Sequence, residues 1–200
     1  KDTPQGKIPV GWEIKSIEEC YRTSSGGTPS RKISEYYGDD HDWIKTKELR
    51  DSFILETEEK ISDLGLAKSS AKLFPRHTTI IAMYGATIGR LGITTDEAAT
   101  NQACCALLPL EDVYSPWFIY LTLKEKKPEI LALGQGAAQQ NISQQVIKGF
   151  KFLAPEESLL MLFNERVEPL FLQMENLLKK NNNLKQQRDL LLPKLLSTGV

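Results

Sequence analysis

The chain has 200 residues, of which 40% are hydrophobic, so it is long enough for one large domain, or a domain with an appendage, and too apolar for wholesale disorder. Its formal net charge of −1 argues against a protein that binds polyanions over its whole surface. No run approaches the roughly 18 apolar residues of a membrane span, and no secretory signal opens the chain. Three cysteines without metal-ligand spacing (Cys20, Cys104 and Cys105) favour a reduced, cytoplasmic protein.

Up to about residue 154 the sequence predicts a mixed α+β, strand-rich globular domain. DDHDW, at residues 39–43, is interpreted as a solvated turn after Gly38, because no second ligand cluster accompanies it to form a metal site. Residues 78–83 and 88–94 are rich in β-branched residues and predict a closely turned strand pair. ACCALLPL, at residues 103–110, predicts another strand, in which the adjacent cysteines act as small apolar residues.

Two helices and a final strand are predicted in the next part of the chain. SPWFIYLTLKEKK begins with Ser115 as the N-cap and Pro116 at the first helical position. SQQVIKG is expected to form a short helix between Ser143 as cap and Gly149 as stop. VIKGFKFLAP alternates like a half-buried strand.

After Pro155 the pattern changes to a sustained 3.5-residue period that predicts a long C-terminal helix. Pro169 lies off the apolar seam and should start or kink this helix. We expect a coiled-coil dimerisation arm at residues 155–200, following a globular domain at residues 1–154; the alternative is an amphipathic helix packed on its own domain. The predicted dimerisation seam consists of Val167, Leu170, Met174, Leu177, Asn181, Leu184, Leu191 and Leu195.

Nothing in the sequence supports catalysis. GATIGRLG lacks the Lys-Ser/Thr ending of a phosphate loop, so its glycines are interpreted as permitting tight turns. His77 has no Ser or Cys context that would make a nucleophile.

Recognition features are more plentiful, in four polar segments. Gln and Asn suit adenine in the major groove, Arg suits guanine, and Lys with hydroxyls suits phosphate. GQGAAQQNIS suits either a linker or a recognition loop, and a purely structural turn is an equal alternative for any one of its residues. Lys45 and Lys47 are expected on the same side of an extended segment. The DNA-binding candidates are Thr28, Arg31, Lys32, Lys45, Thr46, Lys47, Tyr84, Thr87, Arg90, Gln139, Gln140 and Asn141.

These residues also carry a family resemblance. GKIPVGWEI, SGGTPSR, WIKTKEL, LFPRHTTIIAMYGATIGRLGI, TNQACCAL, GAAQQNIS and LLPKLLSTG occur in the order seen in type I restriction–modification DNA specificity subunits. The chain resembles one target-recognition domain followed by one conserved helical region. Complete members usually carry two of each, so the chain is either a half-size subunit that pairs with itself or a fragment.

The resemblance implies a non-catalytic subunit without a cofactor of its own. It would read half of a bipartite site in double-stranded DNA. Its partners would be methyltransferase (modification) subunits that use S-adenosylmethionine and a restriction subunit that uses ATP. One alternative is a coiled-coil assembly module with a protein-binding globular domain. A stand-alone methyltransferase is disfavoured, because the sequence has neither a glycine-rich cofactor loop nor an Asn-Pro-Pro-aromatic or Asp-Pro-Pro-aromatic tetrapeptide.

Overall fold

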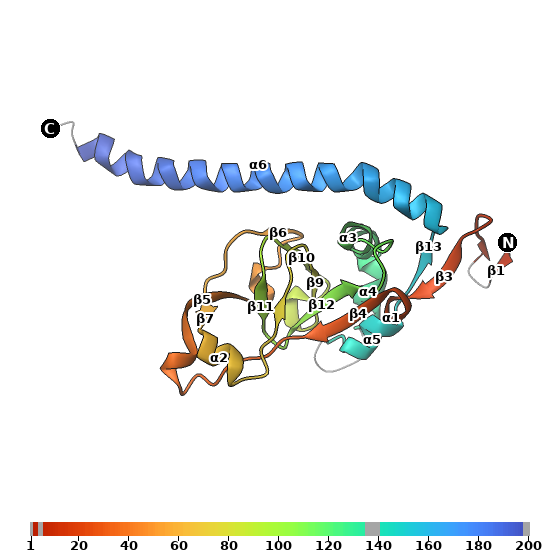
Figure 1. Cartoon of the computed structure of the whole chain (residues 1–200), viewed down its shortest axis with the longest axis horizontal. Coiled ribbons are helices and arrows are strands. Elements are labelled where there is room, and N and C mark those ends of the chain that lie inside the picture. The colour runs from red at the N-terminus through yellow and green to blue at the C-terminus, as the bar shows by residue number, and fades with distance from the viewer. Residues whose placement is uncertain (1, 4–5, 135–140, 198–200) are drawn as a thin grey trace.

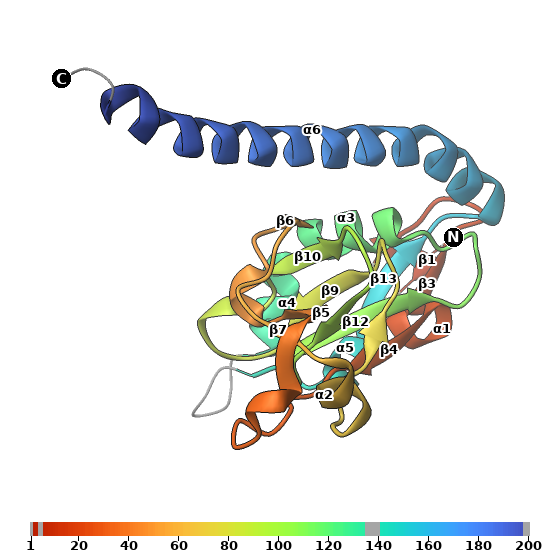
Figure 2. The same cartoon turned by 60° about the vertical axis from the view of Figure 1, so that its left-hand side comes forward.

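The computed structural model describes residues 2–3, 6–134 and 141–197. It shows a strand-rich body and one long C-terminal helix that runs along one side of it (Figure 1). The α+β fold expected from the sequence is therefore confirmed. A view turned by 60° shows the strands of the body stacked beneath this helix (Figure 2).

A five-stranded sheet forms the centre of the body. Its neighbouring strands are antiparallel, except for the edge pair β10 and β6, which is parallel. The predicted turned pair is confirmed, since β9 and β10 pair through Ile81 and Leu91 and are joined by the 3-10 turn η3 (Gly85–Thr87). In order across the sheet the strands are β4 (Tyr21–Ser25), β12 (Cys104–Pro109), β9 (Thr79–Ala82), β10 (Leu91–Thr94) and β6 (Ser52–Ile54).

A four-stranded sheet corrects one prediction. DDHDW is not a solvated turn but part of β5, where its acidic residues lie on a partly exposed strand. Burial of Trp43 and Ile44 at the end of β5 and pairing with β7 hold this segment extended, while a shift in register between Tyr37 and His41 leaves the residues between them exposed. The strands in order are β7 (Lys60–Ile61), β5 (Tyr37–Ile44), β11 (Ala98–Thr100) and β8 (Leu73–Phe74).

Two small sheets lie at one end of the body, beside the N-terminus and the start of the C-terminal helix (Figure 1). β13 pairs antiparallel with β3, so the chain returns to its start immediately before the C-terminal helix. The strand predicted within VIKGFKFLAP is confirmed as β13. These four strands are β1 (Asp2–Thr3), β2 (Gly6–Lys7), β3 (Glu13–Ser16) and β13 (Lys151–Ala154).

Both predicted helices of the body are confirmed with their caps. Ser115 Oγ accepts a hydrogen bond of 3.2 Å from Phe118 N, and Ser143 Oγ accepts one of 3.2 Å from Val146 N. The short helices are α1 (Ile17–Cys20), α2 (Asp63–Ala67), α3 (Pro116–Glu125), α4 (Lys127–Leu133) and α5 (Gln144–Gly149), with 3-10 turns η1 (Ser34–Tyr36) and η2 (Thr46–Glu48).

The buried interior explains the adjacent cysteines. Cys104 and Cys105 are fully buried in β12 and lie in two different hydrophobic clusters, as expected for alternating side chains of a central strand. Burial raises the pKa of the Cys105 thiol to about 12. Both residues therefore act as small apolar side chains, as predicted.

The C-terminal helix α6 (Glu157–Ser197) has 41 residues and continues through Pro169, with a bend near its N-terminal end (Figure 1). Its first half is part of the core. Leu160 and Phe171 are buried in the largest hydrophobic cluster, and Phe171 stacks on Trp117 of α3 with 4.8 Å between ring centroids. The helix thus has the packed face of the amphipathic alternative, while the division into two domains stays a prediction.

Candidate nucleic-acid interface

The predicted recognition segments leave the sheets at one common end. β4 ends at Ser25, which pairs with Cys105, and β9 ends at Ala82, which pairs with Cys104 at the beginning of β12. Three segments therefore meet the sheet side by side: the one that follows β4, the one that follows β9 and the one that precedes β12. We call this edge the recognition end.

Two further segments join the recognition end. Asn101 N, just before β12, donates a hydrogen bond of 2.9 Å to the carbonyl of Ile44, the residue that precedes Lys45. Asn141 forms an isolated bridge with Tyr84, and Ile142 N donates to Met83 O at 2.9 Å. The structure therefore brings together segments that are as much as 113 residues apart, from Thr28 to Asn141. Gln139 and Gln140, also predicted here, lie outside the described residues.

The glycine-rich segment after β4 is packed too closely to accept side chains. A Cβ on Gly26 would lie 1.9 Å from the carbonyl oxygen of Thr100, so residue 26 must be glycine for the backbone to approach β11. The exposed Thr28 donates its hydroxyl to the side-chain oxygen of Gln102. Sequence reasoning missed Gln102 as a site residue, although it lies in the motif TNQACCAL.

Three predicted cations, Arg31, Lys45 and Lys47, meet at this end and are named the basic cluster. They contact two glutamates that the sequence analysis did not select, Glu58 and Glu59, named the acidic pair. Arg31 makes a bidentate contact with Glu59 at 2.5 and 2.9 Å. Lys45 contacts both glutamates, at 3.2 Å in the case of Glu58, and Lys47 contacts Glu58. The run of acids in ETEEK was the available signal.

The conformation of the segment that carries Lys45 and Lys47 differs from the prediction. Thr46 is not in an extended segment, because it begins the 3-10 turn η2. The turn forms because Glu48 Oε2 accepts a hydrogen bond of 2.8 Å from Lys45 N, as in a capping box. Lys45 and Lys47 nevertheless lie near one another, since both contact Glu58.

Aromatic rings hold Arg31 in place. Its guanidinium carbon lies 4.3 Å from the ring centroid of Tyr37 and 5.3 Å from that of Trp43. Tyr37 is itself fixed, because its hydroxyl donates to the carbonyl of Pro29 at 2.7 Å. Hydrogen bonds from Arg31 and Lys45 lower the pKa of the Glu59 carboxyl to about 2. Lys32, the residue after Arg31, is exposed.

The turn between β9 and β10 presents a second group of candidates. Tyr84 is 40% exposed and Arg90 is exposed, whereas the Thr87 hydroxyl donates to the carbonyl of Tyr84 at 3.1 Å. Gly85 and Gly89 have φ of +68° and +71°, which confirms their interpretation as turn residues. The third glycine of GATIGRLG differs, because it lies within β10.

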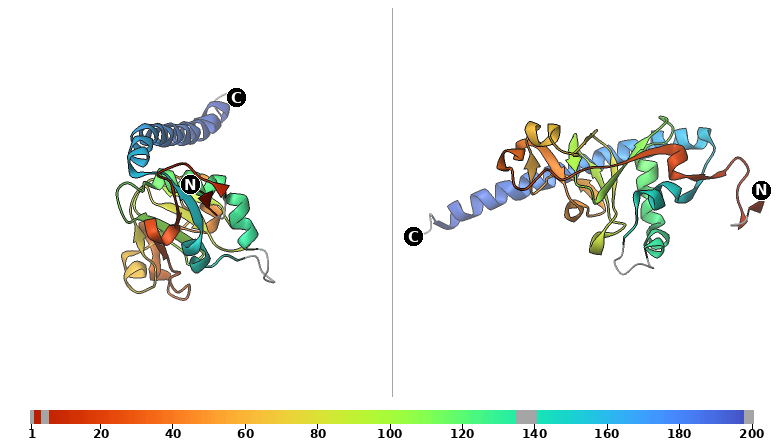
Figure 3. Two further views of the ribbon diagram at one scale, coloured as in Figure 1. Left: turned by 90° about the vertical axis from the view of Figure 1, so that its right-hand side faces the viewer. Right: turned by 90° about the horizontal axis from the view of Figure 1, so that it is seen from below.

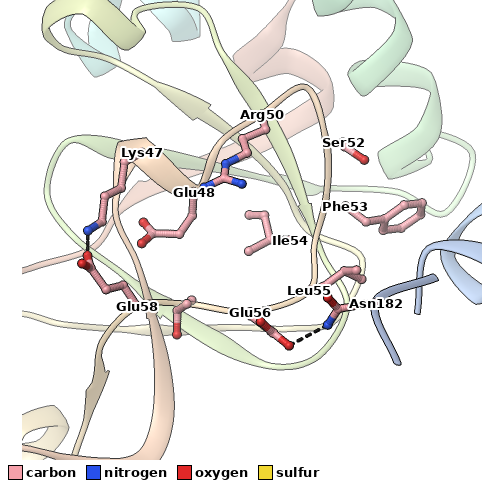
Figure 4. A pocket seen from close by; sticks show the side chains of 11 residues that line it. Lys47, Glu48, Arg50, Ser52, Phe53, Ile54, Leu55, Glu56, Glu58 and Asn182 are labelled. Carbon is pink, nitrogen blue, oxygen red and sulfur yellow. Dashed lines mark hydrogen bonds and ion pairs between the residues drawn. The ribbon is translucent and has the colours of Figure 1, made fainter. Parts of the chain in front are cut away.

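A hollow of about 590 Å³ lies between the basic cluster and α6 (Figure 4). Lys47, Glu48 and Arg50 line it on one side, and Arg50 is a cation that the sequence analysis did not select. On the other side Asn182 of α6 donates to Glu56 Oε1 at 2.6 Å. The distal part of α6 therefore borders the recognition end.

A buried carboxylate fixes α6 to the body. Glu175 is 1% exposed and accepts hydrogen bonds from Arg76 Nη2 to both oxygens at 3.0 Å, while His77 Nε2 lies 2.9 Å from one of them. Lys179 adds an ion pair at 2.8 Å. Burial raises the pKa of Glu175, but the hydrogen bonds from Lys179, His77 and Arg76 outweigh this and lower it to about 2. We call this group the helix clamp.

Residues 9–158 match the model of the type I restriction modification DNA specificity domain. The chain belongs to this family. It is 31% identical to the HindI specificity subunit of Haemophilus influenzae over 96% of the chain and 42% of that protein. It is 29% identical to the MjaIX specificity subunit of Methanocaldococcus jannaschii over 84% of the chain and 41% of that protein. The chain therefore spans less than half the length of these curated relatives.

Solved structures support the same fold for this family member. The HsdS subunit of Thermoanaerobacter tengcongensis aligns with a TM-score of 0.59 and 13% identity, over 86% of this chain and 41% of that one. The S subunit from M. genitalium aligns with a TM-score of 0.55 and 18% identity, over 92% and 47%. At these identities the likeness shows the fold alone.

Beyond Val167, the apolar seam of this specificity-domain chain is exposed on the outer side of α6. Val167 is half-buried against the core, and Asn181 is exposed. Figure 3 shows α6 end-on and from below, lying outside the sheets. The exposed seam residues are Leu170 (63%), Met174 (40%), Leu177 (52%), Leu184 (60%), Leu191 (54%) and Leu195 (70%).

Within residues 2–3, 6–134 and 141–197, no helix is long and apolar enough to cross a membrane, and no group of potential ligands could hold a metal ion.

Proposed function

We propose that this chain is a sequence-specific DNA-recognition unit that directs a type I restriction–modification complex to one half of a bipartite site. The observation that carries the proposal is the recognition end, where four polar segments chosen from sequence alone converge in a chain of the DNA specificity family. Separate loops held on a rigid sheet are the usual means of presenting several contacts to one ligand.

The residue types at the recognition end divide into two roles. Lys45, Lys47 and Lys32, with the hydroxyls of Thr28 and Thr46, are proposed to contact phosphates. Arg31 and Arg90 are proposed to read guanine, and the amides of residues 139–141 adenine or a water bridge. Tyr84 and Thr87 shape the turn that presents Arg90.

The partners follow from the same proposal. The matched relatives are named specificity subunits of restriction enzymes, and this chain covers 42% and 41% of their lengths. We propose that it acts beside a second such unit and docks methyltransferase subunits that use S-adenosylmethionine and a restriction subunit that uses ATP, in the cytoplasm. The chain itself would bind no cofactor and catalyse no reaction.

Self-association through α6 is proposed as the way in which the second unit is supplied. An antiparallel pair centred on Asn181 would place the recognition ends of two chains apart, so that they read inverted half-sites. The 27 residues from Leu170 to Leu196 would span roughly 40 Å, comparable with one DNA turn of about 34–36 Å. The exposed apolar seam supports this pairing.

The same seam favours the second candidate function, a coiled-coil assembly module whose body binds protein. Selection from a degenerate duplex library separates the two. The DNA-recognition proposal expects enrichment of a short motif by the chain together with its methyltransferase, and methylation of that motif in cells. Because the chain has near-neutral charge, we expect weak DNA binding by the chain alone. Absence of any enriched motif would favour the assembly module.

A further inference from the structure

Carboxylates already occupy the basic cluster in the free chain, although the side chains of Arg31 and Lys47 stay 54% and 51% exposed. Arg31, Lys45 and Lys47 carry one more charge than the two glutamates that contact them. The side chain of Lys45 is only 16% exposed, which places its ammonium between the glutamates rather than in bulk water. A DNA oxygen could reach the ammonium of Lys45, or the two N–H groups of Arg31 that bind Glu59, only by replacing a carboxylate oxygen.

The geometry around Arg31 is already that of a bound acceptor pair. Its guanidinium lies on the ring of Tyr37, and two of its N–H groups donate to the two oxygens of Glu59. A phosphate and the O6/N7 edge of guanine each present two acceptors to an arginine in a similar way. Glu59 therefore stands where a bidentate acceptor of DNA would bind.

We propose that Glu58 and Glu59 are specificity-determining residues, which occupy the basic cluster in the free chain and must be displaced by DNA. This inference rests on the proposed DNA-recognition function. On a non-cognate duplex the exchange replaces one ion pair by another and leaves two bare carboxylates close to phosphates, so little affinity is gained. At the cognate site, base contacts elsewhere on the recognition end hold the DNA acceptor in place. They offset the cost of separating the two glutamates from the basic cluster.

The acidic pair lies at the surface, outside the hydrophobic clusters of the fold. Its side chains are 62% and 31% exposed, and exposed ion pairs contribute little to stability because of solvation, side-chain entropy and salt screening. Glutamine in place of each glutamate retains size and a hydrogen-bond acceptor while it removes the charge. The variant Glu58→Gln/Glu59→Gln should therefore stay folded, with a modest loss of stability because the Glu59 carboxylate loses its pairing with Arg31 and Lys45.

A matched control comes from two other exposed acids. Glu56 lies in the same segment, but its carboxylate accepts from Asn182 and Gln186 at 2.6 and 2.8 Å instead of from a cation. Glu18 is an exposed residue of α1. The variant Glu18→Gln/Glu56→Gln changes net charge by the same amount and leaves the basic cluster paired.

The experiment compares the wild-type chain and the two variants on heparin, on a random duplex and on the duplex enriched from the library. With Glu58→Gln/Glu59→Gln, elution from heparin should need more salt than with the control. Affinity for the random duplex should rise about tenfold or more, and the slope of log affinity against log salt should steepen by about 1–3. Affinity for the enriched duplex should rise less, so the specificity ratio should fall.

Equal behaviour of the acidic-pair and control variants on heparin and on the random duplex would overturn this inference. Motif enrichment by the wild type would meanwhile leave the proposed function standing. Conversely, a wild type that enriches no motif would remove the proposed function even if the variant gained heparin affinity. Arg31→Lys distinguishes the two acceptors: discrimination is lost at one base pair if Arg31 reads guanine, whereas all duplexes weaken alike if it contacts phosphate.

Discussion

The two halves of α6 follow one helical period in different surroundings. In the first half, Leu160, Phe171 and Glu175 are nearly inaccessible and belong to the core or the helix clamp. In the second half, Leu184 and Leu195 are 60% and 70% exposed, and the helix extends past the body (Figure 1). The body covers the side of the first half next to the seam and leaves Leu170 and Met174 of the seam exposed. A heptad pattern therefore predicts an apolar stripe, but it does not predict which side of the helix the chain's own body covers.

Substitutions in the two halves of α6 should differ most in how much they lower the stability of the monomer. Phe171→Ala removes a ring that contacts Trp117, Phe53 and Tyr120, and should destabilise the protein by about 3–5 kcal/mol. Leu184→Ala, on the exposed stripe, should change stability by less than about 0.5 kcal/mol. Urea unfolding at low protein concentration measures both. A similar loss from the two substitutions would break the comparison.

Acid should weaken the attachment of the first half of α6 to the body, because it protonates Glu175 of the helix clamp. Its pKa falls from 4.5 to about 2 on folding, so the ionised carboxylate stabilises the fold fully above about pH 4.5, and this contribution is lost as pH falls toward 2. The shift corresponds to at most about 3 kcal/mol. Glu175→Gln should be less stable than the wild type at pH 7, and the gap should shrink at pH 2.5. A gap that is independent of pH would contradict this role of the carboxylate.

The second half should show its effect in association instead. Leu177→Lys places a charge on the exposed seam and should weaken self-association at least tenfold, with little change in monomer unfolding. Sedimentation equilibrium across a range of concentrations measures the first effect and urea unfolding the second. A wild type that stays monomeric at high micromolar concentration would remove the seam as a dimer contact.

Local features explain what the sequence could predict. Ser115 and Ser143 cap helices because a cap needs only neighbouring residues, and the β9–β10 pair forms across one short turn. DDHDW was misjudged because its pairing with β7 is set by residues about 20 positions further along the chain. The strand propensity of this acidic segment is low, and tertiary packing overrides it.

The candidate site shows the same limit. Arg31, Lys45 and Lys47 were selected by residue type, but their partner Glu59 lies 28 residues from Arg31 along the chain. Arg50 and Gln102 were missed because each stands among residues with ordinary packing roles. The sequence shows which segments carry polar residues. It does not show that these segments converge at one end of the sheets, because their convergence follows from strand pairings that residue order alone does not specify.

The smallest energetic effect, and the sharpest test of the second half, concerns Asn181. In an antiparallel pair, the seam from Val167 to Leu195 is centred on this residue, so two Asn181 side chains meet near the twofold axis. There each amide can satisfy the other, whereas an amide buried opposite leucine would be unpaired. A buried asparagine lowers stability while it fixes register and orientation. Asn181→Leu should therefore tighten self-association and permit parallel as well as antiparallel pairs.

Spectroscopic labels on the surface of each recognition domain measure the distance between the two bodies. Wild type should give one long distance, and Asn181→Leu should add a shorter population, because a parallel pair places both bodies at the same end. Asn183→Leu makes the same substitution at an exposed position off the seam and should keep the single long distance. A single short distance in the wild type would contradict antiparallel pairing. It would also remove the argument that the length of the second half sets the spacing between half-sites, since both recognition ends would then lie together.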